Sequence, residues 1–346
     1  MGVKRVLVIA GSDSSGGAGL EADQKVLTAH GCYSMTATTA LTAQNTQGVY
    51  GIQETPPEFV GKQIDACLSD IGADGVKIGM LASSAIINAV ADILQARPQP
   101  FVVLDPVMVA TSGAQLLPEP AIQGLCQKLL PITTILTPNI PEAKLLLQEC
   151  GKSPRDVQNV DDIVALAKDV QQLGPRFVLL KGGHLPLNSE KASPAEEADQ
   201  TLIANVLVGE DQVTVIEQPY LKSRNTHGTG CSLASAIAAN LAAGMEMIRA
   251  VKLGCRYVEA GIRDSRGLGD GNGPINHFHS SSMLPFSPGY FLEWLLDRDD
   301  VQGPWKEYTE HKFVQQLADA TLPLEAFRHY MVQDYLYLVS GLMLYT

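Results

Sequence analysis

The chain has 346 residues, of which 45% are hydrophobic and 18% charged, with 37 acidic against 25 basic side chains and a formal net charge of −12. This composition supports a buried core in one or two domains and excludes global disorder. The negative charge and the lack of a basic tract in the sequence argue against a nucleic-acid or anionic-membrane surface. A small cationic pocket inside an acidic protein is still compatible with this composition.

Membrane and export segments are not expected. No run reaches the roughly 18 apolar residues of a spanning helix. Residues 1–10 lead straight into a strand-like run without the features of a signal peptide. The six cysteines are scattered without a C-x-x-C pair, which disfavours a zinc cluster and favours a reducing compartment. We therefore expect a cytoplasmic protein without a membrane partner.

Short apolar runs alternate with amphipathic stretches over residues 1–266. The runs predict strands that are buried on both faces, and they cover residues 6–10, 76–78, 101–104, 132–136 and 177–180. Helical patterns begin near Leu20, Pro57, Ser84 and Pro141. This alternation predicts an α/β fold with a mostly parallel central sheet and helices on both faces.

The last third of the chain departs from this alternation. Residues 202–208 and 213–216 flank a polar turn and predict a hairpin. Residues 267–289 are rich in Gly, Ser, Pro and His and are interpreted as a linker. Residues 290–346 are aromatic and predict a short helical extension with at most a marginal core of its own. We therefore expect three parts, with the first ending at residue 266.

A glycine-rich loop, GSDSSGGAG, occupies residues 11–19 between the first strand and the first helix. It has Gly17 where a P-loop needs Lys, and it lacks the G-x-G-x-x-G fingerprint of dinucleotide-binding folds. Its clustered glycines would let backbone N–H groups approach a ligand closely. The alternative interpretation is a flexible turn.

A second loop, NTHGTGC, covers residues 225–231 and precedes a buried helical stripe. The unpaired N–H groups of a first helical turn and the positive end of its dipole favour an anion, such as a phosphoryl group in transfer. Cys231 lies in this turn, where a thiol pKa is lowered. The alternative is that Cys231 is a small buried apolar side chain.

Seven motifs in order resemble those of the hydroxymethylpyrimidine/phosphomethylpyrimidine kinases of thiamine biosynthesis, within the ribokinase-like superfamily. They are GSDSSGGAG (11–19), LTAQNT (41–46), KIGML (77–81), LDPVM (104–108), TPNIPE (137–142), LKGGH (180–184) and HGTGC (227–231). The resemblance spans residues 5–265 and implies a three-layer ribokinase-like fold. It also implies phosphorylation, with ATP and Mg²⁺, of 4-amino-5-hydroxymethyl-2-methylpyrimidine and of its monophosphate. Members of the family are often homodimers.

The resemblance implies a transfer site on the second loop. Cys231 would be the catalytic base that takes the proton of the substrate hydroxymethyl group. Gly228, Thr229 and Gly230 would form the anion hole around the migrating phosphoryl group.

The resemblance also implies a nucleotide and metal site. Lys181 and Asn139 would contact ATP, and Thr111 would belong to a loop over the phosphates, residues 109–113. Asp105 and Glu142 would organise Mg²⁺ together with Asn139, because oxygen ligands suit a hard cation. For Asp105, the role of a helix cap or turn residue is an open alternative.

Six residues would surround the pyrimidine on the same grounds: Gly11, Ala18, Asp23, Gln44, Met80 and Val107. Asp23 can accept a hydrogen bond from the exocyclic amine, and Gln44 can donate and accept. Met80 would supply apolar contact with the ring. Ordinary packing is the alternative for Gln44 and Met80.

Residues 313–338 have a resemblance of their own, to the opening helices of TenA-type aminopyrimidine hydrolases, which fungal-type thiamine enzymes fuse behind the kinase. Asp334 and Tyr337 match pyrimidine-contacting positions of that family. Its nucleophilic Cys and acidic partner have no counterpart in this sequence, so we expect no hydrolase activity. For the chain as a whole, a pyridoxal or pyridoxine kinase and a catalytically inactive ligand-binding relative are the alternatives.

Overall fold

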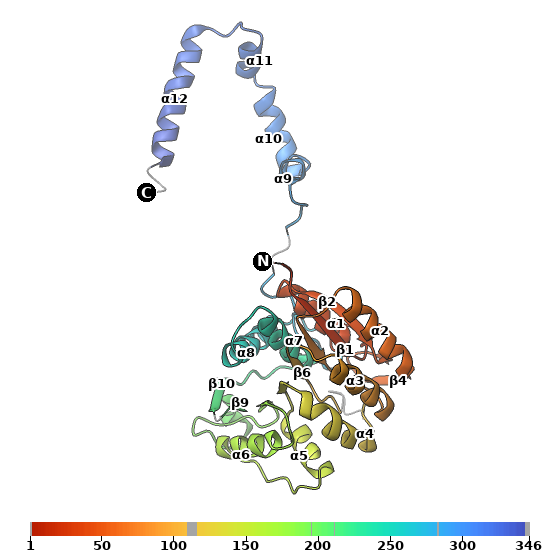
Figure 1. Ribbon diagram of the computed structural model, residues 1–346. Coiled ribbons are helices and arrows are strands. Elements are labelled where there is room, and N and C mark those ends of the chain that lie inside the picture. Colours follow the sequence, from red (N-terminus) through yellow and green to blue (C-terminus); the bar gives the residue numbers. More distant parts are fainter. Residues whose placement is uncertain (1, 109–115, 195, 211, 282–283, 343–346) are drawn as a thin grey trace. The chain divides into compact units, whose positions relative to one another are not determined.

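The computed structural model describes residues 2–108, 116–194, 196–210, 212–281 and 284–342. The chain divides into two compact units, Met1–Ser281 and Ser282–Thr346, and each is considered by itself (Figure 1). Among the described helices, none combines the length and apolar character that crossing a bilayer requires.

In the described part of the first unit, eight strands form one sheet in the order β10-β9-β8-β7-β6-β5-β1-β2. They are β1 (Arg5–Ala10), β2 (Tyr33–Thr38), β5 (Gly75–Ile78), β6 (Val102–Leu104), β7 (Ile135–Leu136), β8 (Phe177–Leu180), β9 (Leu202–Gly209) and β10 (Gln212–Pro219). Within this sheet, the six neighbouring strands β2, β1, β5, β6, β7 and β8 pair in parallel, whereas β9 pairs antiparallel with both β8 and β10. The predicted mostly parallel sheet and its hairpin are confirmed.

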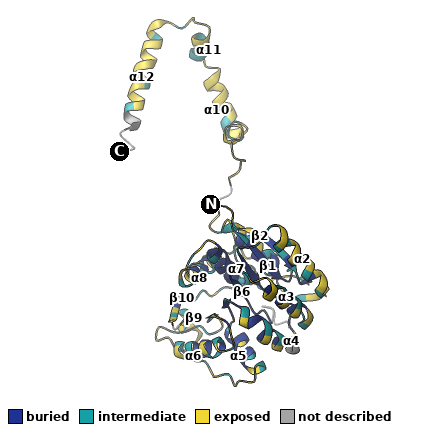
Figure 2. Ribbon diagram, viewed as in Figure 1, coloured by how far each residue is buried: buried dark blue, intermediate teal, exposed yellow. Residues whose placement is uncertain are grey.

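Helices cover both faces of this sheet (Figure 1). One layer holds α1 (Gly19–Ala29), α7 (Thr229–Ala242) and α8 (Met247–Arg263), and the other holds α2 (Pro57–Asp70), α3 (Ser84–Ala96), α4 (Glu119–Gly124), α5 (Ile140–Glu149) and α6 (Val160–Gln171). A π-helical turn (Leu125–Leu129) and a 3₁₀ turn (Leu130–Ile132) follow α4, and another 3₁₀ turn (Glu197–Asp199) precedes β9. Val6 and Val8 of β1 pack with the α1 layer, and Leu7 and Ile9 pack with the α2 layer. The central strands β1, β5, β6, β7 and β8 are therefore buried on both faces (Figure 2), as expected for a parallel sheet.

A separate hairpin carries the motif of residues 41–46. Its strands are β3 (Ala40–Gln44) and β4 (Val49–Glu54), which pair antiparallel. Thr39 N–H donates to the carbonyl of Ala10 at 2.9 Å, and Ser12 N–H donates to the carbonyl of Ala40 at 2.8 Å. These bonds hold the hairpin against the loop that follows β1.

The boundary of the first unit differs from the predicted linker of residues 267–289, because this unit runs to Ser281. Ile275 and His277 are buried, the Tyr257 hydroxyl donates to the His277 carbonyl, and His227 N–H donates to the Gly273 carbonyl at 3.1 Å. A Cβ on Gly271 would lie 2.1 Å from the Thr46 carbonyl oxygen, so this part of the segment packs on the body rather than forming a free connection.

The second unit is helical, as predicted. It contains α9 (Phe291–Leu296), α10 (Asp299–Thr309), α11 (Lys312–Ala318) and α12 (Leu324–Leu342). No side chain that the structure describes in this unit is buried, and Figure 2 shows α10 and α12 as largely exposed. Tyr335 and Tyr337 are 66% and 75% exposed. The described part of this unit therefore has no core of its own.

Candidate active site

A cavity of about 620 Å³ lies at the carboxyl ends of the parallel strands. Its lining includes Gly11 after β1, Met80 after β5, Asp105 after β6, Asn139 after β7 and Lys181 after β8. Open parallel sheets bind ligands at this edge, and the volume suits a small-molecule site. The motifs that were scattered along the sequence therefore meet in one place.

The first glycine loop is organised around Asp13. Its Oδ1 accepts from the N–H (2.9 Å) and the hydroxyl (2.7 Å) of Ser15, and its Oδ2 accepts from the N–H of Ala18 at 2.8 Å. Gly19, which begins α1, has φ +56°, and a Cβ there would stand 2.4 Å from the carbonyl oxygen of Gly11. The loop is therefore a fixed structure with backbone in close approach, and not a flexible turn.

The second glycine loop ends in a helix whose first turn faces the cavity. Gly228, Thr229, Gly230 and Cys231 all line the cavity. Gly228 has φ +77°, and a Cβ on it would lie 1.9 Å from the carbonyl oxygen of Gly17. No side chain among the described residues caps α7. The N–H of Thr229 donates to the Thr226 carbonyl at 3.3 Å, so within the described structure the amides of Gly230 and Cys231 are the ones available to an anion.

The surroundings of Cys231 overturn the expectation of a lowered thiol pKa. Burial raises the pKa of Cys231 to about 12, and the carboxylates of Asp23 and Asp105 add to the rise. The Lys77 ammonium and the N–H of Gly19 act in the opposite direction without compensating. Burial therefore outweighs the local effect of the helix terminus, and Cys231 is a thiol in the free site at neutral pH.

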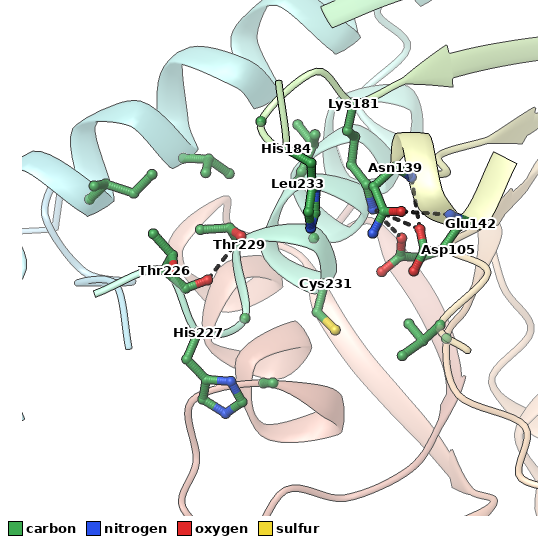
Figure 3. A pocket seen from close by; sticks show the side chains of 18 of the residues that line it. Asp105, Asn139, Glu142, Lys181, His184, Thr226, His227, Thr229, Cys231 and Leu233 are labelled. Carbon is green, nitrogen blue, oxygen red and sulfur yellow. Dashed lines mark hydrogen bonds and ion pairs between the residues drawn. The ribbon is translucent and has the colours of Figure 1, made fainter. Parts of the chain in front are cut away.

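Lys181 is held among acidic side chains on the opposite side of Cys231 from His227 (Figure 3). Its Nζ lies 2.8 Å from Asp105 Oδ1 and 3.9 Å from Glu142 Oε2. Burial alone would lower the pKa of Lys181, but these carboxylates raise it, so the side chain is an ammonium. A Cβ on Gly230 would lie 3.1 Å from this nitrogen. The ammonium is therefore beside the first turn of α7.

Asn139 and Glu142 form a capping box at the start of α5. The Asn139 side-chain oxygen accepts from Glu142 N–H at 2.8 Å, and Glu142 Oε2 accepts from Asn139 N–H at 2.8 Å. Burial, together with the charge of Asp105, raises the pKa of Glu142 to about 7 against the opposing effects of Lys181 and the Asn139 N–H. Both side chains line the cavity, so capping fixes them where a phosphate or a cation would be.

Asp23 does not occupy its expected place beside the pyrimidine. It is fully buried, and it is missing from the described residues that line the cavity. Its oxygens lie 2.9 and 2.7 Å from Lys77 Nζ, and one of them accepts from the Ser235 hydroxyl at 2.7 Å. Burial alone would lower the pKa of Lys77, but Asp23 raises it, so Lys77 stays charged. Asp23 is thus the counterion of Lys77 beneath the site.

The other expected pyrimidine residues do meet in the cavity. Its lining includes Gly11, Ala18, Gln44, Met80 and Val107. A Cβ on Gly11 would stand 2.3 Å from Cε of Met80, so the methionine covers the glycine. The Thr42 hydroxyl lies 2.9 Å from the Ser12 carbonyl and 3.2 Å from Gln44 Oε1, and Gln44 Nε2 lies 3.4 Å from His227 Nε2, so both ends of the Gln44 amide have a polar neighbour. Thr111 lies outside the described residues.

Several lining residues were not predicted from the sequence. Asp13, Lys77, His184 and His227 are polar, and a further part of the wall comes from β9, β10, the residue after β10 and α8: Ile203, Asn205, Gln218, Tyr220, Val258 and Ile262. His227 belongs to the motif of residues 227–231, so the sequence did contain a signal for it. The lining residues of β10 and α8 belong to none of the seven motifs, so the sequence held no comparable signal for them.

Comparisons with known proteins agree with this geometry. The phosphomethylpyrimidine kinase family matches residues 13–276, and the TENA/THI-4/PQQC family matches residues 298–344. A hydroxymethylpyrimidine/phosphomethylpyrimidine kinase of Saccharomyces cerevisiae is 38% identical over 369 residues, with coverage of 97% of this chain and 65% of that protein. One from Haemophilus influenzae is 40% identical over 283 residues, with coverage of 81% and 99%.

A solved structure has the same fold. The Bacillus subtilis pyridoxal kinase, in an ADP complex, has a TM-score of 0.68 and 30% identity and covers 80% of this chain and 98% of its own. The chain spans 62% to 65% of the length of the fungal relatives that it matches. The expected ribokinase-like architecture and both family resemblances are confirmed, and the chain belongs to the phosphomethylpyrimidine kinase family.

Proposed function

We propose that this protein transfers the γ-phosphoryl group of ATP to the hydroxymethyl oxygen of 4-amino-5-hydroxymethyl-2-methylpyrimidine, and then phosphorylates the monophosphate. The observation that carries the proposal is the uncapped first turn of α7, which opens onto the cavity that Lys181 and Gln44 also line. Transfer of a phosphoryl group depends chiefly on positioning and on positive electrostatic surroundings. Around Gly230, the first turn of α7 would position the phosphoryl group and the Lys181 ammonium would supply the positive charge.

The two ends of the cavity suit two substrates. Gln44, Met80 and Gly11 at one end offer a hydrogen-bonding amide and an apolar surface to a flat aminopyrimidine. Val258 and Ile262 of α8 belong to the other part of the wall and offer apolar contact to a nucleotide base. The phosphates would then lie between, where the amides of α7 and Lys181 meet.

The donor set also fits Mg²⁺. Asp105 and Glu142 offer carboxylate oxygens and Asn139 offers an amide oxygen around Lys181. No three His, Cys, Asp or Glu side chains within the described ranges form a metal cage. Mg²⁺ commonly binds through one or two carboxylates with substrate phosphates and water completing its shell. When bound, it would neutralise phosphate charge, and the three side chains would hold it.

Cys231 is the proposed proton acceptor. As the hydroxymethyl oxygen forms its bond to phosphorus and the bond to the ADP oxygen breaks, the O–H proton passes to the sulfur. Only the thiolate can take it, and this form is scarce at neutral pH because burial raises the pKa of Cys231 to about 12. Among the described residues, Lys77, Lys181 and the Gly19 amide stabilise the thiolate.

The test is ADP release measured in parallel with the pyrimidine alcohol, its monophosphate and pyridoxine. We expect turnover with both pyrimidines and little with pyridoxine. Turnover with pyridoxine alone would support the second candidate, a pyridoxine kinase, which the similarity to the Bacillus pyridoxal kinase favours. Binding of the pyrimidine without ADP release would indicate an inactive ligand-binding relative.

We also propose that two copies of the chain associate through the β3–β4 hairpin. Leu41, Tyr50 and Ile52 on it, and Phe59 at the start of α2, are 41% to 68% exposed, which is typical of an interaction surface. Light scattering of the wild type and of Tyr50→Lys tests this, since the variant should be a monomer. A monomeric wild type would contradict it.

The free thiols of all six cysteines support a reducing, cytoplasmic setting.

A further inference from the structure

Asp13 and His227 form a buried pair that joins the two glycine loops. His227 Nε2 lies 2.7 Å from Asp13 Oδ2, and the two residues are 5% and 2% exposed. Burial opposes ionisation of Asp13, but hydrogen bonds from His227 and Ser15 bring its pKa to about 2. An ionised carboxylate only accepts hydrogen bonds, so the proton of this bond is on His227 Nε2.

The same carboxylate oxygen also holds the end of the first loop. Asp13 Oδ2 accepts from Ala18 N–H at 2.8 Å in addition to His227. The N–H of Asp13 donates to Glu21 Oε2 at 2.7 Å, which ties the loop to the first turn of α1. Without the imidazole, a buried charge would lose one of its donors, and the loop would lose its side-chain hydrogen bond to residues 225–231.

This link brings backbone from the first loop to the catalytic sulfur. The N–H of Gly19 faces the Cys231 thiol. The loops also touch directly, because a Cβ on Gly17 would lie 2.5 Å from Cδ2 of His227, and one on Gly228 would lie 1.9 Å from the Gly17 carbonyl oxygen. There is thus little room for the first loop to shift without a change in the surroundings of Cys231.

We infer that His227 is a positioning residue for phosphoryl transfer. By donating to Asp13, it holds residues 11–19 against the start of α7, so that the Gly19 amide stays at Cys231 and Gly11 and Ala18 stay at the pyrimidine end. The inference rests on the proposed function, because it assigns His227 a task in that reaction. In Figure 3, His227 lies on the opposite side of Cys231 from Lys181 and Asp105, so it acts through the first loop rather than on the phosphates.

Hydrogen exchange and kinetics test this with four variants of the full chain. His227→Leu removes the donor, His227→Gln keeps an N–H of similar reach, and Asp13→Asn removes the charged acceptor. His30→Gln is the control, because this imidazole is half-buried and bonds the Val26 carbonyl at 2.8 Å at the other end of α1.

We expect His227→Leu to speed amide exchange in peptides of residues 11–19 by at least about tenfold, the worth of a hydrogen bond to a charged group. It should lower kcat with the pyrimidine alcohol by about 10- to 100-fold, as small misplacements do, and leave the KM for ATP near the wild-type value. His227→Gln should recover most of both losses. Combining His227→Leu with Asp13→Asn should cost no more than the worse single change.

Three results would overturn the inference. Wild-type exchange of residues 11–19 in His227→Leu would show that the pair does not hold the loop. Equal behaviour of the Gln and Leu variants would show that the N–H donor is irrelevant, and equal exchange in His30→Gln would indicate general loosening. If the wild type phosphorylates no pyrimidine, the proposed function fails, while the exchange result still decides whether His227 holds the loop.

Discussion

Replacing Asp23 by Asn should destabilise the protein rather than weaken a substrate contact. Asp23 and Lys77 are fully buried, and the shortest distance between their charged atoms is 2.7 Å. Asp23→Asn would keep an acceptor for the Ser235 hydroxyl, which lies 2.7 Å away, but would leave the ammonium of Lys77 without a counterion. Breaking a buried ion pair from one side costs about 3–5 kcal/mol.

The loss is large enough to measure by calorimetry. For a unit of this size, 1 kcal/mol shifts Tm by about 2–4 °C, so the expected decrease is about 6–20 °C. The control combines Asp23→Asn with Lys77→Met, which removes both charges and keeps the length of the side chain. It should regain most of the loss, because a neutral replacement of a buried pair is often close to break-even.

Kinetics measured well below the unfolding temperatures of the wild type and the variant distinguish a structural role of Asp23 from a role in substrate binding. The KM for the pyrimidine should stay close to wild type in Asp23→Asn, since Asp23 does not line the cavity in the described structure. A wild-type Tm together with a raised KM in Asp23→Asn would place the carboxylate at the substrate and refute the reasoning from burial.

The remaining predictions concern transfer itself. Cys231→Ala should lower turnover by about 10²–10⁴ while calorimetric binding of the pyrimidine persists; unchanged turnover would remove Cys231 from its role. Because burial raises the pKa of Cys231 to about 12, the thiolate fraction grows about tenfold per pH unit below that value. The wild-type kcat should therefore rise from about pH 6 to 9, whereas the pH profile of Cys231→Ala should be flat. A flat wild-type profile would contradict this. Lys181→Ala should raise the KM for ATP, measured at saturating pyrimidine, and an unaltered KM would mean that the phosphates lie elsewhere. Deleting residues 282–346 should leave the kinetics unchanged, because all described lining residues precede them; lost activity in a folded product would show that the first unit depends on the second.

The sheet could be predicted where its strands are buried on both faces. Residues 6–10 and 177–180 must be continuously apolar there, and they became β1 and β8. β2, β3 and β4 escaped prediction because their exposure alternates or is nearly complete, so Thr, Ser and Gly interrupt any apolar run. Their place depends on pairing and hairpin contacts between residues distant in the sequence, which local pattern does not encode.

The site could be predicted where the chemistry is local. The glycines at positions 19 and 228 mark backbone that touches other backbone, and the structure places both at such contacts. Asp23 could not be placed, because its partner Lys77 is 54 positions away in the sequence and meets it only in the folded structure. The prediction of a lowered pKa for Cys231 was wrong for a related reason, since a helix terminus is visible in the sequence and the burial of the thiol in the folded structure is not.

The most direct test of the central claim is to follow the labelled γ-phosphate of ATP by mass spectrometry, with the pyrimidine alcohol and Mg²⁺ present. If the amides at the start of α7 and Lys181 guide a transfer, the label should appear on the hydroxymethyl oxygen of the pyrimidine, in step with ADP. Label recovered as inorganic phosphate, with the alcohol unchanged, would contradict the account.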